Sequence, residues 1–176
     1  DFYDHIFGAG PHQVREMRAI EKQRNLPRKN LVEHGYERLD KLIAKAPTFS
    51  PCSADTSGEK VHVLIAPSWS DQGIVESGFG EDLVSQLLDL GFTVTLRPHP
   101  QTTILAPDRI TRLLDRFSSQ NNFHYEANVA GSESLFASSM MISDWSGAAL
   151  DYALSQSKPV LFIDVPRKVN NPQYQE

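Results

Sequence analysis

A serine, an aspartate and a glycine stand close together in the segment Ser143-Asp144-Trp145-Ser146-Gly147. The segment lies between an apolar run and a stretch of small residues that predicts a helix beginning at Ser146. The unpaired N–H groups of a helix start, its dipole and the Ser146 hydroxyl could together bind an anion, and Gly147 would let a phosphate approach the backbone. Alternatively, Ser146 only caps the helix and Asp144 bonds its own turn. The sequence leaves both interpretations open.

A second segment, Arg97-Pro98-His99-Pro100, places an arginine and a histidine between prolines directly after a predicted strand. The prolines restrict the backbone around both side chains. A guanidinium group suits phosphate oxygens, and an imidazole exchanges protons near neutral pH. The motif therefore indicates a second part of a phosphate site, with a stiff surface turn as the alternative.

A further histidine that could act as a base is His12, which follows Gly8-Ala9-Gly10-Pro11 in the first turn of a predicted helix. The helix dipole at this position favours the neutral imidazole. The glycines are not a dinucleotide-binding fingerprint, because the third glycine and the acidic residue after a following strand are missing. A solvated or structural histidine is the alternative. The remaining histidines lie in or beside strand-like runs and are interpreted as structural: His5, His34, His62 and His124.

Composition argues against several other classes of function. The formal net charge of -5 gives no broad basic surface for nucleic acid. The single cysteine, Cys52, rules out an intramolecular disulfide and fits a reducing compartment. No His, Cys, Asp and Glu cluster has metal-ligand spacing, and no apolar run is long enough to cross a bilayer. We therefore predict no metal, no cofactor apart from the substrate and no nucleic-acid partner. Trp69 and Trp145 could line a base or an acceptor, with packing in the core as the default interpretation.

The elements that position these motifs alternate between strand and helix after residue 60. The apolar run 61–66 predicts a strand buried on both faces. Further strands are expected at 92–96, 123–125, 140–142 and 159–163, with helices at 80–90, 107–117, 132–137 and 146–155. This pattern predicts an α/β fold: a Rossmann-like parallel sheet with helices on both faces. Because ligands bind beyond the carboxyl ends of such strands, the polar motifs should gather at one end of the sheet.

The N-terminal part is organised differently. It has short strands expected at 5–7 and 31–35, and helices at 11–24 and 36–45. Residues 46–60 are rich in proline, serine and threonine and lack periodicity, which is linker composition. We predict that residues 1–45 end an N-terminal, acceptor-side domain and that 46–60 form a linker. Residues 61–176 are predicted to form a donor-binding domain that is truncated at its C-terminus, and the chain is interpreted as part of a longer protein.

Taken together, the motifs resemble the CDP-glycerol:poly(glycerophosphate) glycerophosphotransferases, the family of the teichoic acid primases and polymerases. The arginine-histidine motif at 97–100, the segment 143–147 with the helix after it, and residues 158–164 carry the resemblance. Gly10-Pro11-His12 and residues 32–40 resemble the family's segment before its nucleotide domain. The resemblance implies a GT-B architecture, with two Rossmann-like domains facing a cleft and the donor held mainly by the C-terminal domain.

The resemblance also implies the reaction, in which an acceptor hydroxyl attacks the β-phosphate of a CDP-activated donor such as CDP-glycerol and CMP leaves. The product is a polyol phosphate joined to a polyol or glycan acceptor. By position, His12 and His99 match the family's two important histidines. Many members have an aromatic residue followed by two serines where this chain has Trp145-Ser146-Gly147, a difference that bears on the donor. The residues assigned to donor binding are Arg97, Ser132, Glu133, Ser143, Asp144, Ser146, Gly147, Arg167 and Lys168.

The resemblance implies a cytoplasmic enzyme at the inner face of the cell membrane, with an acceptor that can be lipid-linked. With its net negative charge and no polybasic run, this chain is itself predicted to make no direct membrane contact. Two other functions stay open. One is a GT-B glycosyltransferase, which would release a nucleoside diphosphate from a nucleotide sugar. The other is a non-catalytic module that binds nucleotides.

Overall fold

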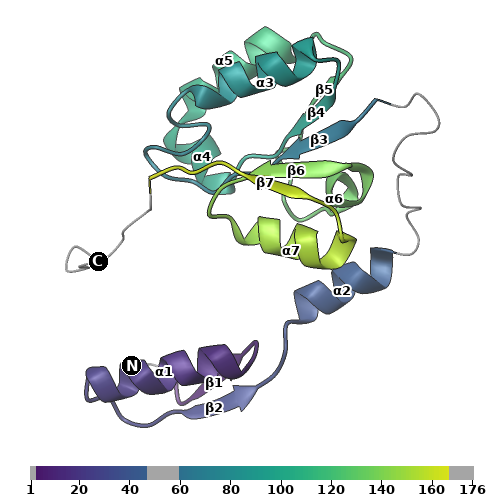
Figure 1. The fold of residues 1–176 in the computed structure, drawn as a ribbon. Helices are drawn as coiled ribbons and strands as arrows, with labels where there is room; N and C mark the ends of the chain where they lie inside the picture. Colours follow the sequence, from purple (N-terminus) through teal and green to yellow (C-terminus); the bar gives the residue numbers. More distant parts are fainter. Residues whose placement is uncertain (1–2, 47–59, 167–176) are drawn as a thin grey trace. The chain divides into compact units, whose positions relative to one another are not determined.

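The computed structural model describes residues 3–46 and 60–166, which belong to two compact units (Figure 1). The first unit is Asp1–Lys41 and the second is Leu42–Glu176. Most of the predicted linker at 46–60 lies outside the described residues, as do Arg167 and Lys168. The boundaries of the predicted domains therefore stay a prediction, and each unit is described by itself.

The first unit is a small strand–helix–strand arrangement. Strands β1 (His5–Gly8) and β2 (Asn30–Glu33) pair in parallel, and helix α1 (Pro11–Gln23) connects them. Pro11 takes the first helical position, where its missing N–H breaks no helical hydrogen bond. Helix α2 (Glu37–Lys45) follows and contains the boundary between the two units, after Lys41; it has acidic residues in its first turn and a lysine in its last, as the helix dipole favours.

The second unit is built on five parallel strands in the spatial order β5-β4-β3-β6-β7. The central strand β3 has no exposed surface from Val63 to Ile65, which explains its continuous apolar sequence. Every pairing in this sheet is parallel, so the predicted Rossmann-like sheet is confirmed. The strands are β3 (His62–Ile65), β4 (Thr93–Leu96), β5 (Phe123–Tyr125), β6 (Met140–Ser143) and β7 (Val160–Phe162).

Helices cover both faces of the sheet, as predicted (Figure 1). On one face, α3 (Phe79–Asp89) and α5 (Pro107–Phe117) pack on alternate strand residues that include Val63 and Ile65. On the other face, Leu64 of the same strand packs with residues of α6 (Glu133–Ala137) and α7 (Gly147–Gln156). Successive side chains of a strand point to opposite faces, so a single apolar strand supplies both cores.

One helix was not predicted from the sequence. Residues Pro100–Leu105 form helix α4, with His99 as its N-terminal cap, where the sequence had indicated either part of a phosphate site or a stiff surface turn. Pro100 occupies the first helical position, the one place where proline favours a helix. The other predicted strands and helices agree with the structure to within two residues at either end.

The strand order places a topological switch point between β3 and β6. From β3 the chain continues through α3 to β4 on one side, and from β6 it continues through α7 to β7 on the other. In open α/β sheets, the crevice outside the carboxyl ends of two such strands is where ligands bind. The loops at 66–78 and 144–146 are therefore the first place to look for a functional site.

Candidate functional site

Asp144 joins the two loops at the switch point. Its Oδ1 accepts a hydrogen bond of 2.6 Å from the backbone N–H of Ser68, which follows β3. Asp144 is only 3% exposed, and its Oδ2 is buried without a hydrogen-bond partner among the residues that the structure describes. Asp144 thus accepts a hydrogen bond from the neighbouring loop through Oδ1, while Oδ2 can accept a further one. Since buried polar atoms are normally hydrogen-bonded, a ligand group is a natural partner for Oδ2.

The residues around Asp144 divide into those that hold the loop and those that face open space. Ser143 is fully buried, and its hydroxyl donates to the carbonyl of Ala66 at 2.7 Å, which holds β6 to the end of β3. The Ser146 hydroxyl accepts the N–H of Ala148 at 3.3 Å and caps α7, as predicted. A methyl group added at Gly147 would meet no described atom within 4 Å. The start of α7 therefore combines a cap with open space beside the backbone.

A cavity of about 500 Å³ opens beside the start of α7. Most of its wall is apolar, and the charged groups among the described residues that line it are two carboxylates. Trp145 is 58% exposed, so the default interpretation that it packs in the core is wrong. The indole Nε1 donates to the carbonyl of Val165 at 3.0 Å, and this bond holds the ring in the cavity wall. The residues that line the cavity are Asp144, Trp145, Ser146, Gly147, Leu150, Phe162, Ile163 and Asp164.

His99 lies at the end of the neighbouring strand, β4, and is half-buried. Its Nδ1 accepts the backbone N–H of Gln101 at 3.1 Å as it caps α4. Because Nδ1 is the acceptor, the neutral imidazole in this arrangement carries its proton on Nε2. The Trp69 ring, from the loop after β3, lies 6.3 Å from the His99 ring between centroids. His99 therefore faces the loop that Asp144 also holds.

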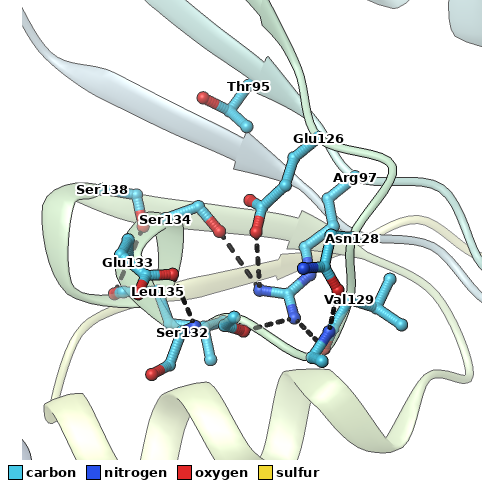
Figure 2. A network of polar contacts seen from close by, with 12 residues as sticks. Thr95, Arg97, Glu126, Asn128, Val129, Ser132, Glu133, Ser134, Leu135 and Ser138 are labelled. Carbon is cyan, nitrogen blue, oxygen red and sulfur yellow. Dashed lines mark hydrogen bonds and ion pairs between the residues drawn. The ribbon is translucent and has the colours of Figure 1, made fainter.

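Arg97 is bonded to the loop that precedes α6, and Figure 2 shows its guanidinium among these groups. Its Nη2 donates to the carbonyls of Val129 and Gly131, at 2.6 and 2.9 Å. Its Nη1 donates to the Ser134 hydroxyl at 3.1 Å and lies 3.8 Å from a carboxylate oxygen of Glu126. Arg97 is 7% exposed. In this arrangement it fixes the loop, and its predicted contact with phosphate stays a prediction.

Ser132 and Glu133 begin α6 within the loop that Arg97 fixes. The exposed Glu133 carboxylate accepts the backbone N–H of Ser132 at 3.0 Å, whereas the Ser132 side chain makes no capping bond (Figure 2). The structure therefore places both residues on the β5–α6 connection. Their assignment to donor binding stays a prediction.

Glu76, in the loop after β3, is a carboxylate that sequence reasoning missed. Its Oε1 accepts the hydroxyl of Thr102 in α4 at 2.6 Å, so it ties the loop after β3 to the helix that His99 caps. Its Oε2 and the Ser70 hydroxyl of the same loop are buried without partners within the described residues. An acidic residue in a loop after a buried strand is too common a signal to have identified it.

His12 and His62 occupy different settings. His12 is exposed in the first turn of α1, within the first unit, and its pairing with His99 stays a prediction. Burial lowers the pKa of His62, whose Nε2 lies 2.7 Å from the Thr95 hydroxyl inside the sheet. His62 therefore has the structural setting that its place in a strand indicated.

Two further observations concern the residues that the structure describes, 3–46 and 60–166. No group of three or more His, Cys, Asp or Glu side chains in these residues is arranged to hold a metal ion. No helix formed by them is long and apolar enough to cross a membrane.

A five-stranded parallel sheet with a candidate anion site at its switch point defines a Rossmann-like α/β domain of the kind that binds phosphorylated ligands. The family model for CDP-glycerol:poly(glycerophosphate) glycerophosphotransferases matches residues 1–167, and the chain belongs to this family. The resemblance of the sequence motifs to this family is thereby confirmed.

Among solved structures, the chain is similar to the wall teichoic acid polymerase TagF, in a structure obtained after a soak with CDPG. The TM-score is 0.57 and the sequence identity 20%, a likeness that concerns the fold alone. The match covers 91% of this chain and 38% of the polymerase chain, so the chain spans well under half of that protein. None of the curated proteins matches the chain.

Proposed function

We propose that this chain supplies the donor site of a transferase that moves glycerol phosphate, or a similar polyol phosphate, from a CDP-activated donor to a polyol or glycan acceptor. Membership of the glycerophosphotransferase family supports the reaction class. The observation that carries the site is Asp144, whose buried carboxylate bridges the loops at the switch point and has one oxygen without a hydrogen-bond donor among the described residues. It lies directly before the open start of α7.

The start of α7 is the proposed position of the donor pyrophosphate. The helix N–H group at Gly147, the dipole of a ten-residue helix and the proton of the Ser146 hydroxyl all favour an anion there. Ser143 holds the loop through Ala66, so its proposed role is to position the site. The Asp144 carboxylate repels phosphate and suits a hydroxyl or amine of the same donor.

The two histidines take different roles in the proposed reaction. An acceptor hydroxyl oxygen bonds to the β-phosphorus, the bond from that phosphorus to the bridging oxygen breaks, and CMP leaves. With its proton on Nε2, the neutral His99 imidazole is suited to donate a hydrogen bond to a phosphoryl oxygen. The role of base that removes the hydroxyl proton is then assigned to His12. No metal or other cofactor takes part in this proposal.

The remaining assignments support the same donor. Arg97 acts by holding the β5–α6 loop, which presents Ser132 and Glu133 near the end of the sheet. Arg167 and Lys168, which follow β7 in the sequence, are assigned to donor binding because they are positively charged. The acceptor is proposed to be a polyol phosphate or glycan that can be lipid-linked, at the inner face of the cell membrane. Attachment to that membrane is assigned to parts of the protein outside this chain.

A thermal-shift screen with CDP-glycerol, CDP-ribitol, CMP and a UDP-sugar tests the donor site. A ligand at a hundred times its dissociation constant stabilises the fold by about 2.7 kcal/mol, which raises the melting temperature by several degrees. We expect this rise with the cytidine nucleotides. No rise with any of them in a folded sample would refute the donor site, and a rise with the UDP-sugar alone would favour the glycosyltransferase alternative. CMP release by the full-length protein then distinguishes an enzyme from a binding module.

A further inference from the structure

We infer that Glu76 is a positioning residue for His99, which it holds in place through the hydroxyl of Thr102. The inference rests on the proposed function, because it concerns how the protein places a histidine that is assigned to the reaction. It is carried by the burial of Thr102, by the short bond between Thr102 and Glu76, and by the buried, hydrogen-bonded loop that contains Glu76.

Helix α4, which His99 caps, has little apolar packing of its own. Of its six residues, all of which the structure describes, only Thr102 is buried, and Thr102 has no exposed surface. Ile104 and Leu105, the large apolar residues of the helix, are 68% and 60% exposed. Helices this short are marginal in water and depend on packing. The attachment of α4 to the rest of the domain therefore depends strongly on what Thr102 contacts.

Thr102 connects His99 to Glu76 in two steps. The backbone N–H of Thr102 donates to the carbonyl of His99 at 2.9 Å, within the helical turn that His99 caps. The Thr102 hydroxyl donates to Oε1 of Glu76 at 2.6 Å. A hydroxyl–carboxylate bond of this length is of the charge-assisted kind, which is roughly twice as strong as a neutral hydrogen bond. Loss of the Glu76 carboxylate should therefore loosen the turn that orients the His99 ring.

The loop that contains Glu76 is itself well fixed. Ile74 and Val75, directly before Glu76, are 0% and 1% exposed. Their carbonyls accept hydrogen bonds from backbone N–H groups of later residues, at 2.7 and 3.0 Å. The same loop contains Ser68, whose N–H binds Asp144 at the switch point. Glu76 thus fixes α4 to the loop that also contacts the proposed donor site, and this link sets the position of His99 relative to that site.

The first test measures CMP release from CDP-glycerol by the full-length protein, with poly(glycerophosphate) as the acceptor. We expect Glu76→Ala and Thr102→Val each to lower kcat by roughly tenfold to a hundredfold, since a misplacement of about 1 Å can cost about a hundredfold in rate. KM for CDP-glycerol should change little, because neither residue lines the cavity and the bond from His99 serves charge that develops in the transition state.

Two further variants of α4 serve as controls. Thr102→Ser keeps the hydroxyl that Glu76 binds, and it should restore most of kcat. Thr103→Val is the matched control, because the Thr103 hydroxyl donates to the carbonyl of Pro100 within the same helix and does not reach the loop after β3. Thr103→Val should leave kcat unchanged.

The ring of His99 supplies a readout that a loss of stability alone would not change. Its Nδ1 accepts the N–H of Gln101 at 3.1 Å, so the neutral imidazole carries its proton on Nε2. Nitrogen NMR of the chain at alkaline pH, where the imidazole is neutral, distinguishes the two tautomers. We expect a lower Nε2–H fraction in Glu76→Ala and Thr102→Val than in the unchanged chain, and the same fraction in the two control variants.

The outcomes separate the positioning role from the proposed function. An unchanged kcat in Glu76→Ala and Thr102→Val, or a loss of kcat without a change of tautomer, would overturn the positioning role and leave the donor site in place. Full kcat in His99→Ala would remove His99 from the proposed reaction and overturn the inference with it. A full-length protein that binds CDP-glycerol but releases no CMP would refute the transferase and the inference together.

Discussion

Replacing Gly147 by alanine separates anion binding from helix capping at the start of α7. The added methyl group meets no described atom within 4 Å, so the folded chain accepts it without a clash. Alanine also restricts the unfolded chain, and the free energy of unfolding should rise by about 0.4–1 kcal/mol. The Cα–Cβ bond of a helical residue tilts toward the helix N-terminus, so the methyl group occupies the space where a phosphate would approach.

Binding should change in the opposite direction to stability. A hydrogen bond to a charged group contributes about 1.5–3 kcal/mol, and its loss should weaken CDP-glycerol binding by roughly tenfold to a hundredfold. Stability is measured by urea denaturation and affinity by isothermal titration calorimetry. Ser146→Ala is the paired variant, because it removes the cap and should lower stability by about 0.5–1 kcal/mol while also weakening binding.

The pair of variants excludes an explanation through stability alone, since their stabilities move apart while both affinities fall. Suppose that Gly147→Ala binds CDP-glycerol with unchanged affinity and that Ser146→Ala loses stability but no affinity. Ser146 would then only cap the helix. The phosphate position proposed at the start of α7 would then be wrong.

Three further predictions concern stability and surface. Arg97→Ala should lower the free energy of unfolding in urea by about 2–4 kcal/mol, because two part-buried carbonyls and a buried hydroxyl lose their donor; a loss under 1 kcal/mol would contradict this. Stability should fall as the pH drops below 6.5, because burial lowers the pKa of His62 and the unfolded chain takes up the proton first. His62→Gln should flatten that part of the urea-denaturation profile, and an unchanged slope would assign it to other groups. With a net charge of -5, the chain should not co-sediment with anionic vesicles at physiological salt, and strong binding would place membrane attachment here.

The sheet was predictable because its three central strands, β4, β3 and β6, are almost fully buried. In a strand such as β3, Val63, Leu64 and Ile65 are all fully buried, so the sequence shows a continuous apolar run. This pattern does not depend on which strands pair with β3. Helix α4 was missed because the prolines beside His99 were considered only for how they restrict the backbone around Arg97 and His99. The sequence did carry the helix signal, since proline is favoured at a first helical position, here that of Pro100.

The residue types of the site were predictable, but their partners were not. Asp144 and Ser68 are bonded across 76 positions of sequence, and local patterns say nothing about such a pair. The same limit applies to Arg97. The local sequence around an arginine at a strand end is the same whether its guanidinium faces a ligand or the carbonyls of a later loop. Trp145 was assigned to the core because aromatic residues usually pack there, whereas its position between β6 and α7 leaves it in the cavity wall.

The distribution of unsatisfied polar atoms supports the switch point independently of any motif. In the described part of the chain, three buried side-chain atoms lack a hydrogen-bond partner: Ser70 Oγ, Glu76 Oε2 and Asp144 Oδ2. All three belong to the loops that follow β3 and β6. Each such atom destabilises the fold by about 1–3 kcal/mol. If these atoms reflected only imperfect packing, they would be scattered over the domain, whereas all three lie at one end of the sheet. Arg97, also buried at a strand end, has its donors bonded within the protein. The buried Arg97 is thus hydrogen-bonded within the protein and holds a loop in place. The buried atoms without a partner lie instead where a ligand with N–H or O–H groups is proposed to bind.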